Sequence, residues 1–126
     1  MERVAHIVLL QLLPALADGD LDAFGPALSE IQRITGGWFA PAQGGAFAPG
    51  ASARLVDRLA DWGAVGGVGQ SSWGPAVYGI VGSQASGEQV AARARAAVGP
   101  GGSVYCSRFD NEGARIVVDG AALATH

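Results

Sequence analysis

Lysine is absent from this 126-residue sequence, and all eight of its basic residues are arginines. A lysine-containing phosphate loop, a Schiff base and a lysine general base are therefore excluded within this chain. Histidine is almost as scarce, because only His6 and His126 carry an imidazole. A zinc site or a Ser/His/Asp triad built from this chain alone is not expected, and we predict no metal ligands.

Cysteine, charge and long hydrophobic runs are scarce too. Cys106 stands alone, so no internal disulfide can form, and a lone cysteine is more often a small core residue than a nucleophile. With 15% charged residues and a net charge of -3, the chain is not expected to bind nucleic acid or an anionic membrane. The apolar residues 4–13 are too short to span a bilayer and lack a signal-peptide pattern, which favours a buried helix in a cytoplasmic protein.

Apolar residues and glycine are what the sequence does contain. A hydrophobic content of 49% indicates one compact domain over residues 1–126. Glycines gather at residues 66–75, which read Gly-Gly-Val-Gly-Gln-Ser-Ser-Trp-Gly-Pro. Glycine lets the main chain approach a ligand closely, and successive amides can form a nest for an anion. This run indicates either a wall of a phosphate or carboxylate pocket, or a sharp connection between strands with glycines for close packing.

Two helices are predicted in the N-terminal third. Residues 3–17 are apolar nearly all round, which indicates a helix that is buried or covered by another domain or subunit. Gly19 fits the end of that helix, and Asp20 or Asp22 fits the cap of the next one. The second helix then has one apolar face, made by Leu21, Phe24, Leu28, Ile31 and Ile34. We expect the two helices to form an antiparallel hairpin.

Residues 36–50 are predicted to be an irregular connection, and loops of that length are disproportionately functional. Gln43, followed by Gly44 and Gly45, would place a carboxamide and exposed backbone at a pocket. An apolar wall of that pocket is expected from Trp38, Phe39 and Phe47. Alternatively, these aromatic side chains simply anchor the connection to the core.

The remaining residues predict further helices and strands. Ser52 is expected to cap one helix, and a capping box at residues 86–89 to open another. Residues 76–81 are strand-like, and alternation over residues 104–109 before a turn predicts a hairpin with residues 114–118. These elements favour an α+β domain in which an antiparallel sheet carries its helices on one face.

One motif in the glycine run is specific: Gly-Val-Gly-Gln-Ser-Ser-Trp-Gly-Pro at residues 67–75. Supporting blocks are Leu-Leu-Pro-Ala-Leu at 12–16, Glu-Ile-Gln-Arg at 30–33 and Gln-Gly-Gly at 43–45. Together they resemble the beta-ribofuranosylaminobenzene 5'-phosphate synthase family of the GHMP kinase superfamily. The resemblance covers about residues 3–118 and implies the superfamily's C-terminal domain, a ferredoxin-like unit with a four-stranded antiparallel sheet.

An activity is also implied by this resemblance. In that family 4-aminobenzoate attacks the anomeric carbon of phosphoribosyl pyrophosphate, with loss of pyrophosphate and carbon dioxide, in methanopterin or tetrahydromethanopterin biosynthesis. No cofactor held by this chain is implied, although Mg²⁺ would accompany phosphoribosyl pyrophosphate in the complete enzyme. Nothing here corresponds to the superfamily's N-terminal domain, so we expect the isolated chain to lack catalysis. We expect a homo-oligomer, or association with that domain.

The candidate binding residues lie in the glycine run and the connection before it. The amides of Gly67 and Gly69 and the hydroxyls of Ser71 and Ser72 are predicted phosphate contacts, because preorganised donors stabilise departing negative charge. Trp73 is predicted either to stack on the arene or to pack under the loop. The other candidates are Gln43, Gly44, Gly45, Gln70, Gly74 and Arg108. No general base is assigned.

Two other function classes remain open from the sequence. A fragment of an ATP-dependent small-molecule kinase of the same superfamily would place the same loop near phosphates. A non-catalytic ligand-binding or dimerisation module would show neither turnover nor selective phosphate binding.

Overall fold

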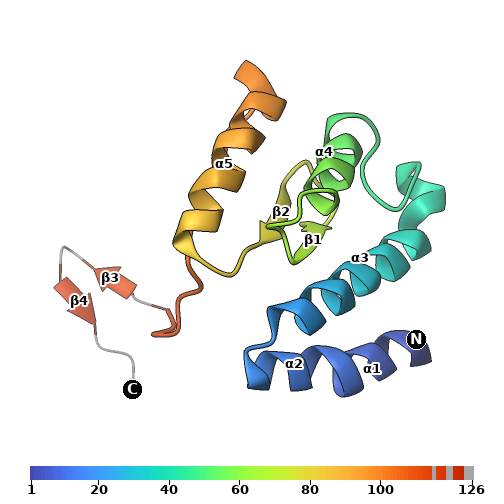
Figure 1. Ribbon diagram of the computed structural model, residues 1–126, viewed down its shortest axis with the longest axis horizontal. Helices are drawn as coiled ribbons and strands as arrows, with labels where there is room; N and C mark the ends of the chain where they lie inside the picture. Colours follow the sequence, from blue (N-terminus) through green and yellow to red (C-terminus); the bar gives the residue numbers. More distant parts are fainter. Residues whose placement is uncertain (115, 119–120, 124–126) are drawn as a thin grey trace.

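The computed structural model describes residues 1–114, 116–118 and 121–123. Its first half is helical and its middle holds a strand hairpin between two further helices (Figure 1). The helices are α1 (Glu2–Ile7), the π-helical η1 (Val8–Leu12), α2 (Leu13–Asp18), α3 (Leu21–Gln43), α4 (Ala51–Ala60), α5 (Gln84–Val98) and the short 3₁₀ helix η2 (Gly99–Gly101). The strands are β1 (Gly67–Gln70), β2 (Val77–Ile80), β3 (Ile116–Val118) and β4 (Ala121–Leu123).

The N-terminal helical hairpin is confirmed. The helices α1, η1 and α2 follow one another without a break and lie alongside α3 (Figure 1). Gly19 ends α2 in the left-handed conformation, with φ of 67°. The Asp20 carboxylate then caps α3 by accepting a hydrogen bond from the amide of Ala23 at 3.0 Å. Arg3 and Glu30 bridge the two arms at 2.7 Å.

The helix α3 is longer than predicted, because it continues through half of the expected irregular connection and ends at Gln43. Gly36 does not break it. A side chain there would lie 2.9 Å from the carbonyl carbon of Ala46, so the glycine lets the returning chain pack directly on the helix. The chain turns back at Gly44, whose φ is 88°. Tertiary packing thus outweighs the weak helix propensity of glycine.

The first half of the glycine run forms strand β1, where a pocket wall or a sharp connection between strands was expected. Antiparallel pairing sets Gly67 opposite Ile80 and Gly69 opposite Tyr78. The other edge of β1 is held by α3: the amide of Val68 donates to the Ser29 hydroxyl at 3.0 Å, and the amide of Gln70 donates to the Gln32 carboxamide at 3.1 Å. The helix therefore covers a strand edge that would otherwise be unpaired.

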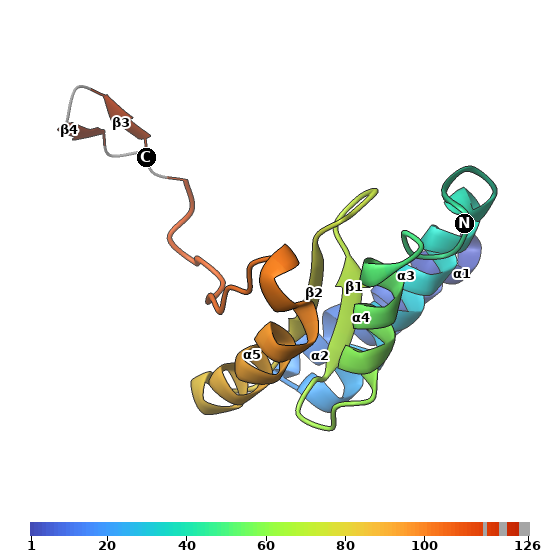
Figure 2. The same ribbon diagram turned by 90° about the horizontal axis from the view of Figure 1, so that it is seen from above.

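The expected four-stranded ferredoxin-like sheet is not formed by the residues that the structure describes. Among them, β1 pairs with β2 and β3 with β4, in two separate two-stranded antiparallel sheets. Residues 104–109 form no strand, so the predicted hairpin between them and residues 114–118 is wrong. Most of these residues are exposed, and β3 and β4 stand apart from the helices (Figure 2). The fold is a mixed helical domain with a small antiparallel sheet.

The core lies where α4 and α5 pack on one face of the β1–β2 hairpin. Its buried side chains are Val56, Leu59, Val68 and Val90. Two predicted caps are wrong. The Ser52 hydroxyl donates instead to the Pro75 carbonyl at 3.1 Å, which ties α4 to the turn before β2. Ser83, not Ser86, caps α5, since its hydroxyl accepts from the amide of Ser86 at 3.1 Å. No helix in the described part of the chain is long and apolar enough to cross a membrane.

Candidate functional site

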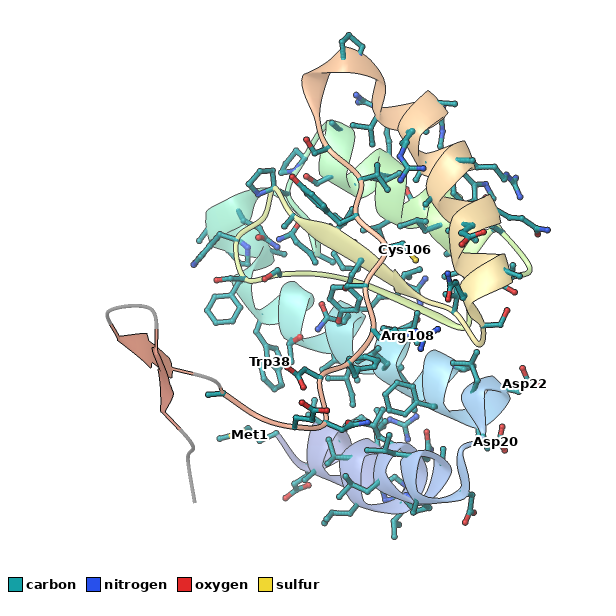
Figure 3. All side chains as sticks on the ribbon, turned by 90° about the vertical axis from the view of Figure 1, so that its left-hand side faces the viewer. Met1, Asp20, Asp22, Trp38, Cys106 and Arg108 are labelled. Carbon is teal, nitrogen blue, oxygen red and sulfur yellow. The ribbon has the colours of Figure 1, made fainter. Side chains whose placement is uncertain are left out.

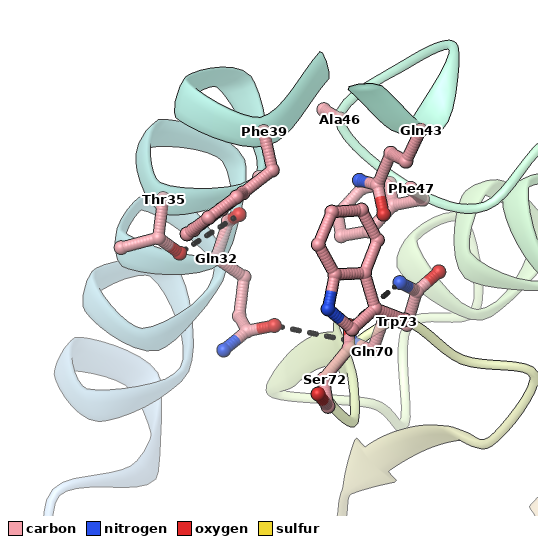
Figure 4. A pocket seen from close by; sticks show the side chains of 10 residues that line it. Gln32, Thr35, Phe39, Gln43, Ala46, Phe47, Gln70, Ser72 and Trp73 are labelled. Carbon is pink, nitrogen blue, oxygen red and sulfur yellow. Dashed lines mark hydrogen bonds between the residues drawn. The ribbon is translucent and has the colours of Figure 1, made fainter. Parts of the chain in front are cut away.

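A pocket of about 220 Å³ opens between the second half of α3 and the turn that follows β1 (Figure 4). Three segments line it: one face of α3, the chain that returns after Gly44, and residues 70–73. The lining residues are Gln32, Thr35, Gly36, Phe39, Gln43, Ala46, Phe47, Gln70, Ser72 and Trp73. Spacings of three and four bring the α3 members onto one face of the helix.

Gln70 links two of the segments that line the pocket. Its side chain is 6% exposed, and both ends of its carboxamide are bonded to the main chain. The oxygen accepts from the amide of Ala48 at 2.6 Å, and the nitrogen donates to the carbonyl of Ser72 at 2.9 Å. Gln70 therefore fixes the returning chain and the turn in one position, and has no polar group left for a ligand.

Gln32 and Gln43 each keep one polar group unused. The Gln32 oxygen accepts from the amide of Gln70 at 3.1 Å, and the Gln43 nitrogen donates to the carbonyl of Gly45 at 2.8 Å. These bonds determine which end of each carboxamide is oxygen. Within the described part of the chain, the Gln32 nitrogen, the Gln43 oxygen and the Ser72 hydroxyl make no hydrogen bond, so the pocket lining offers a carboxamide donor, a carboxamide acceptor and one free hydroxyl.

Aromatic rings form the outer side of the pocket. The rings of Phe39 and Trp73 meet edge to face, with centroids 5.5 Å apart and planes at 68°. Both side chains remain about half exposed. Phe47 lies behind them and packs against the core cluster. Trp73 thus faces the pocket from the turn after β1, and its exposed ring surface can meet a planar ligand.

The lining includes no charged side chain. Arg108 does not reach it: its guanidinium donates to the Gln84 side chain at 2.7 Å, at the start of α5. The segment that carries Arg108 and Cys106 passes that helix end (Figure 3). The structure therefore does not bring Arg108, a predicted candidate for orienting a carboxylate or phosphate, to this pocket.

The predicted site residues fall into two groups. Gln43, Gln70, Ser72 and Trp73 line the pocket, whereas Gly44, Gly45, Gly67, Gly69, Ser71, Gly74 and Arg108 do not. In β1 the outward amides are those of Val68 and Gln70, so alternation turns the amides of Gly67 and Gly69 toward β2. The expected nest of glycine amides is not formed.

Gly69 has a packing reason to be glycine. A side chain there would come within 2.6 Å of the Tyr78 ring and 2.7 Å of the Gln32 carboxamide carbon. Burial raises the pKa of the Tyr78 hydroxyl above its ordinary value of 10.0. Close packing is thus the favoured reason for the glycines in the first half of the run, although that half is a strand and not the expected connection between strands.

Gln32, Thr35, Gly36 and Ala46 were missed from the sequence. The signal for the helical residues was present in the spacing of Gln32, Gly36, Phe39 and Gln43, which continues the helical period past the two glycines. It was masked because residues 36–50 were expected to be irregular. Ala46 had no signal, since only the close approach to Gly36 places it there.

The chain was then compared with known proteins. It is 39% identical over 80 residues to the beta-ribofuranosylphenol 5'-phosphate synthase of Methanothermobacter thermautotrophicus, over 64% of this chain and 23% of that protein. It is 36% identical over 87 residues to the protein of the same name from Archaeoglobus fulgidus, over 69% of this chain and 25% of that protein. The matches thus span about a quarter of the length of these curated relatives.

No solved structure gives a significant match. The family model for the C-terminal region of GHMP kinases matches residues 12–100, a range that contains the whole pocket. The resemblance drawn from the motifs is confirmed by this match and by the two relatives. Since the model covers well over half of the sequence, the chain belongs to the GHMP kinases C terminal family.

Proposed function

We propose that this chain is the C-terminal part of an enzyme that joins an aromatic acceptor to the ribosyl carbon of phosphoribosyl pyrophosphate, in methanopterin or tetrahydromethanopterin biosynthesis. The main support is the pocket, which is lined by aromatic rings and carboxamides and lies within the region matched by the family model. The names of the two relatives support the same reaction class.

The proposed reaction has a defined balance of bonds. The bond between the anomeric carbon and pyrophosphate breaks, and pyrophosphate leaves with the electron pair. A ring carbon of 4-aminobenzoate supplies the pair for the new carbon–carbon bond. The bond to the carboxylate then breaks, carbon dioxide leaves, and its electron pair restores the aromatic ring. Because the relatives are named for a ribofuranosylphenol, 4-hydroxybenzoate is a second candidate acceptor.

In this proposal the turn after β1 assists the departing phosphate. Ser71 and Ser72 are exposed there, and Ser72 has a positive φ of 51°. Hydroxyl donors already in place stabilise a developing negative charge without reorganisation. In the described part of the chain no group of three His, Cys, Asp or Glu side chains could hold a metal ion, so we assign no step to a metal bound by this chain.

A domain exchange tests the proposal. Residues 12–100 would replace the matching region of the Methanothermobacter relative, and release of pyrophosphate and carbon dioxide would be measured with each acceptor. We expect turnover with 4-aminobenzoate or 4-hydroxybenzoate. The unmodified relative is the positive control. A folded chimera that binds donor and acceptor but releases neither product would contradict the proposal.

The second candidate is part of an ATP-dependent small-molecule kinase, which the family match favours. The same chimera, assayed with ATP, separates the two candidates. Transfer of phosphate from ATP without release of carbon dioxide would support the kinase. Absence of both reactions from a folded chimera, together with dimerisation, would support a non-catalytic module.

A further inference from the structure

The pocket beside α3 is small for the proposed donor. Its volume is about 220 Å³, whereas sites for drug-sized ligands usually measure roughly 300–1,000 Å³. A cavity of about 150 Å³ is enough to bind benzene. The pocket therefore accommodates one substituted six-membered ring, but not a ribose with its phosphates.

The charge of the pocket also favours a single ring over a ribose with its phosphates. Its lining has no arginine, and Arg108 is engaged by Gln84 elsewhere. A ribosyl pyrophosphate carries several negative charges, and moving such a group into an uncharged pocket costs free energy unless cations or many donors replace its water. The free donors of the lining, the Gln32 nitrogen and the Ser72 hydroxyl, are too few to meet that need.

The surfaces inside the pocket suit a flat ring. Phe39 and Trp73 present half-exposed aromatic surface on one side, and aromatic pairs gain free energy beyond their buried area. The Gln32 nitrogen and the Gln43 oxygen add one donor and one acceptor. A hydroxyl or amino group on the ring can bond to these, while a carboxylate on the opposite ring carbon stays in water at the exposed aromatic side.

From these contacts we infer that the pocket is the acceptor subsite, which holds a single aromatic ring bearing a hydroxyl or amino group, while the donor's phosphates bind outside it. This inference rests on the proposed function and deepens it. It assigns Phe39, Trp73, Gln32 and Gln43 to the acceptor, and it leaves Ser71 at the rim for the donor.

A binding experiment on this chain tests the inference without turnover. The ¹⁵N-labelled chain would be titrated with 4-aminobenzoate, 4-hydroxybenzoate, cyclohexanecarboxylate and inorganic pyrophosphate, and the indole N–H signal of Trp73 would be followed by NMR. We expect both aromatic acids to shift this signal to saturation. We expect cyclohexanecarboxylate to bind more weakly, and pyrophosphate at saturation to leave the Kd of the aromatic acids unchanged.

Variants make the assignment specific. Phe39→Leu and Trp73→Leu should each weaken the binding of the aromatic acids by about tenfold, because each variant removes a ring contact. Trp73→Leu has lost the indole signal, so its binding would be followed through the backbone amides of the turn. Trp38→Leu is the matched control, since Trp38 is next to Phe39 on α3, is half exposed and does not line the pocket. It should leave the Kd unchanged. Thermal unfolding of each variant identifies any loss of fold.

Three results would overturn the inference: competition by pyrophosphate for the same signals, equal binding of the saturated ring, or aromatic binding that neither variant weakens in the folded chain. These binding results can be told apart from a failure of the proposed function, because the domain exchange measures product release and not binding. An active chimera whose pocket binds no aromatic acid would refute the subsite alone. An inactive chimera with selective aromatic binding would refute the reaction and keep the subsite.

Discussion

At the scale of single residues, buried polar groups decide the shape of the site. Gln70 is nearly fully buried, yet both ends of its carboxamide have main-chain partners. Its oxygen accepts from the amide of Ala48, 22 residues earlier, and its nitrogen donates to the carbonyl of Ser72 in the following turn. A buried polar group without a partner costs about 1–3 kcal/mol, so this pair of bonds favours one arrangement of the returning chain and the turn. Gln70 is a positioning residue, whereas Gln32 and Gln43 retain groups for a ligand.

Tyr78 yields a prediction at the same scale. Burial raises the pKa of its hydroxyl above 10.0 in the folded chain. Below pH 10 the phenol is neutral in both states and has no effect on stability. Above pH 10 the unfolded chain loses this proton first, so the free energy of unfolding should fall as pH rises. Urea unfolding at about pH 8.5 and at about pH 11, on either side of the unperturbed tyrosine pKa of about 10, measures the fall.

The variant Tyr78→Phe should show a smaller fall over the same pH interval. Tyr105→Phe is the control, because Tyr105 is 86% exposed. An equal pH dependence in the wild-type chain and in Tyr78→Phe would contradict the prediction.

At the scale of elements, α3 organises the domain. It caps one edge of β1 through Ser29 and Gln32, and its second half forms one wall of the pocket. It approaches β1 closely at Gly25, where a side chain would overlap the carbonyl of Gly66 and lie 2.8 Å from its Cα. The contact between this helix and the strand therefore depends on glycines from both elements.

Replacement of Gly25 tests this close contact. Gly25→Ala should lower the free energy of unfolding by about 2 kcal/mol or more, because the new methyl group meets backbone atoms that cannot rotate away. The loss should be larger than for an ordinary surface substitution. Urea unfolding followed by circular dichroism gives the value.

Gly37→Ala, in the same helix, is the matched control. A side chain at Gly37 would have nothing within 4 Å, so alanine should raise stability by about 0.5–1 kcal/mol through its better helix propensity. Similar effects of the two substitutions would show that the contact between α3 and β1 does not need Gly25.

At the scale of the whole molecule, the N-terminal helical arm leaves apolar surface uncovered. Four leucines of η1 and α2 are about half exposed or more: Leu9, Leu10, Leu13 and Leu16. Leu9, Leu13 and Leu16 follow spacings of four and three, which place them on one helix face. A contiguous apolar face on a small protein usually marks an interaction surface.

We propose that this face mediates self-association of the chain, which sedimentation equilibrium can measure. The wild-type chain should show a larger average mass as its concentration rises. The double variant Leu9→Glu/Leu13→Glu should remain monomeric, because burying two carboxylates in an apolar contact is costly. Gln11→Glu adds a charge to the same arm at an exposed site and should associate like the wild type. A monomeric wild-type chain at every concentration would refute self-association.

Much of the helical half could be predicted from the sequence, because its signals are local. The cap at Asp20, the helix end at Gly19 and the apolar period of α3 all depend on groups a few residues apart. The motif at residues 67–75 likewise identified the family, since it is read as a string. Trp73 was a candidate as part of that string, and Gln43 because it precedes two glycines at residues 44 and 45.

The tertiary structure alone decided what the glycines and carboxamides do. Ser29 bonds to Val68 across 39 residues, Gln32 to Gln70 across 38, and Gln70 to Ala48 across 22. Such contacts leave no local pattern, so the sequence did not predict strand β1 in the first half of the glycine run, the helix over residues 36–43, or the absence of a four-stranded sheet among the described residues. The sequence by itself determined the N-terminal helical hairpin and the family, because the signals for both are short in sequence. Only packing between distant segments decided where the pocket lies. Its walls come together because glycine allows close backbone contact and because buried amide groups need hydrogen-bond partners.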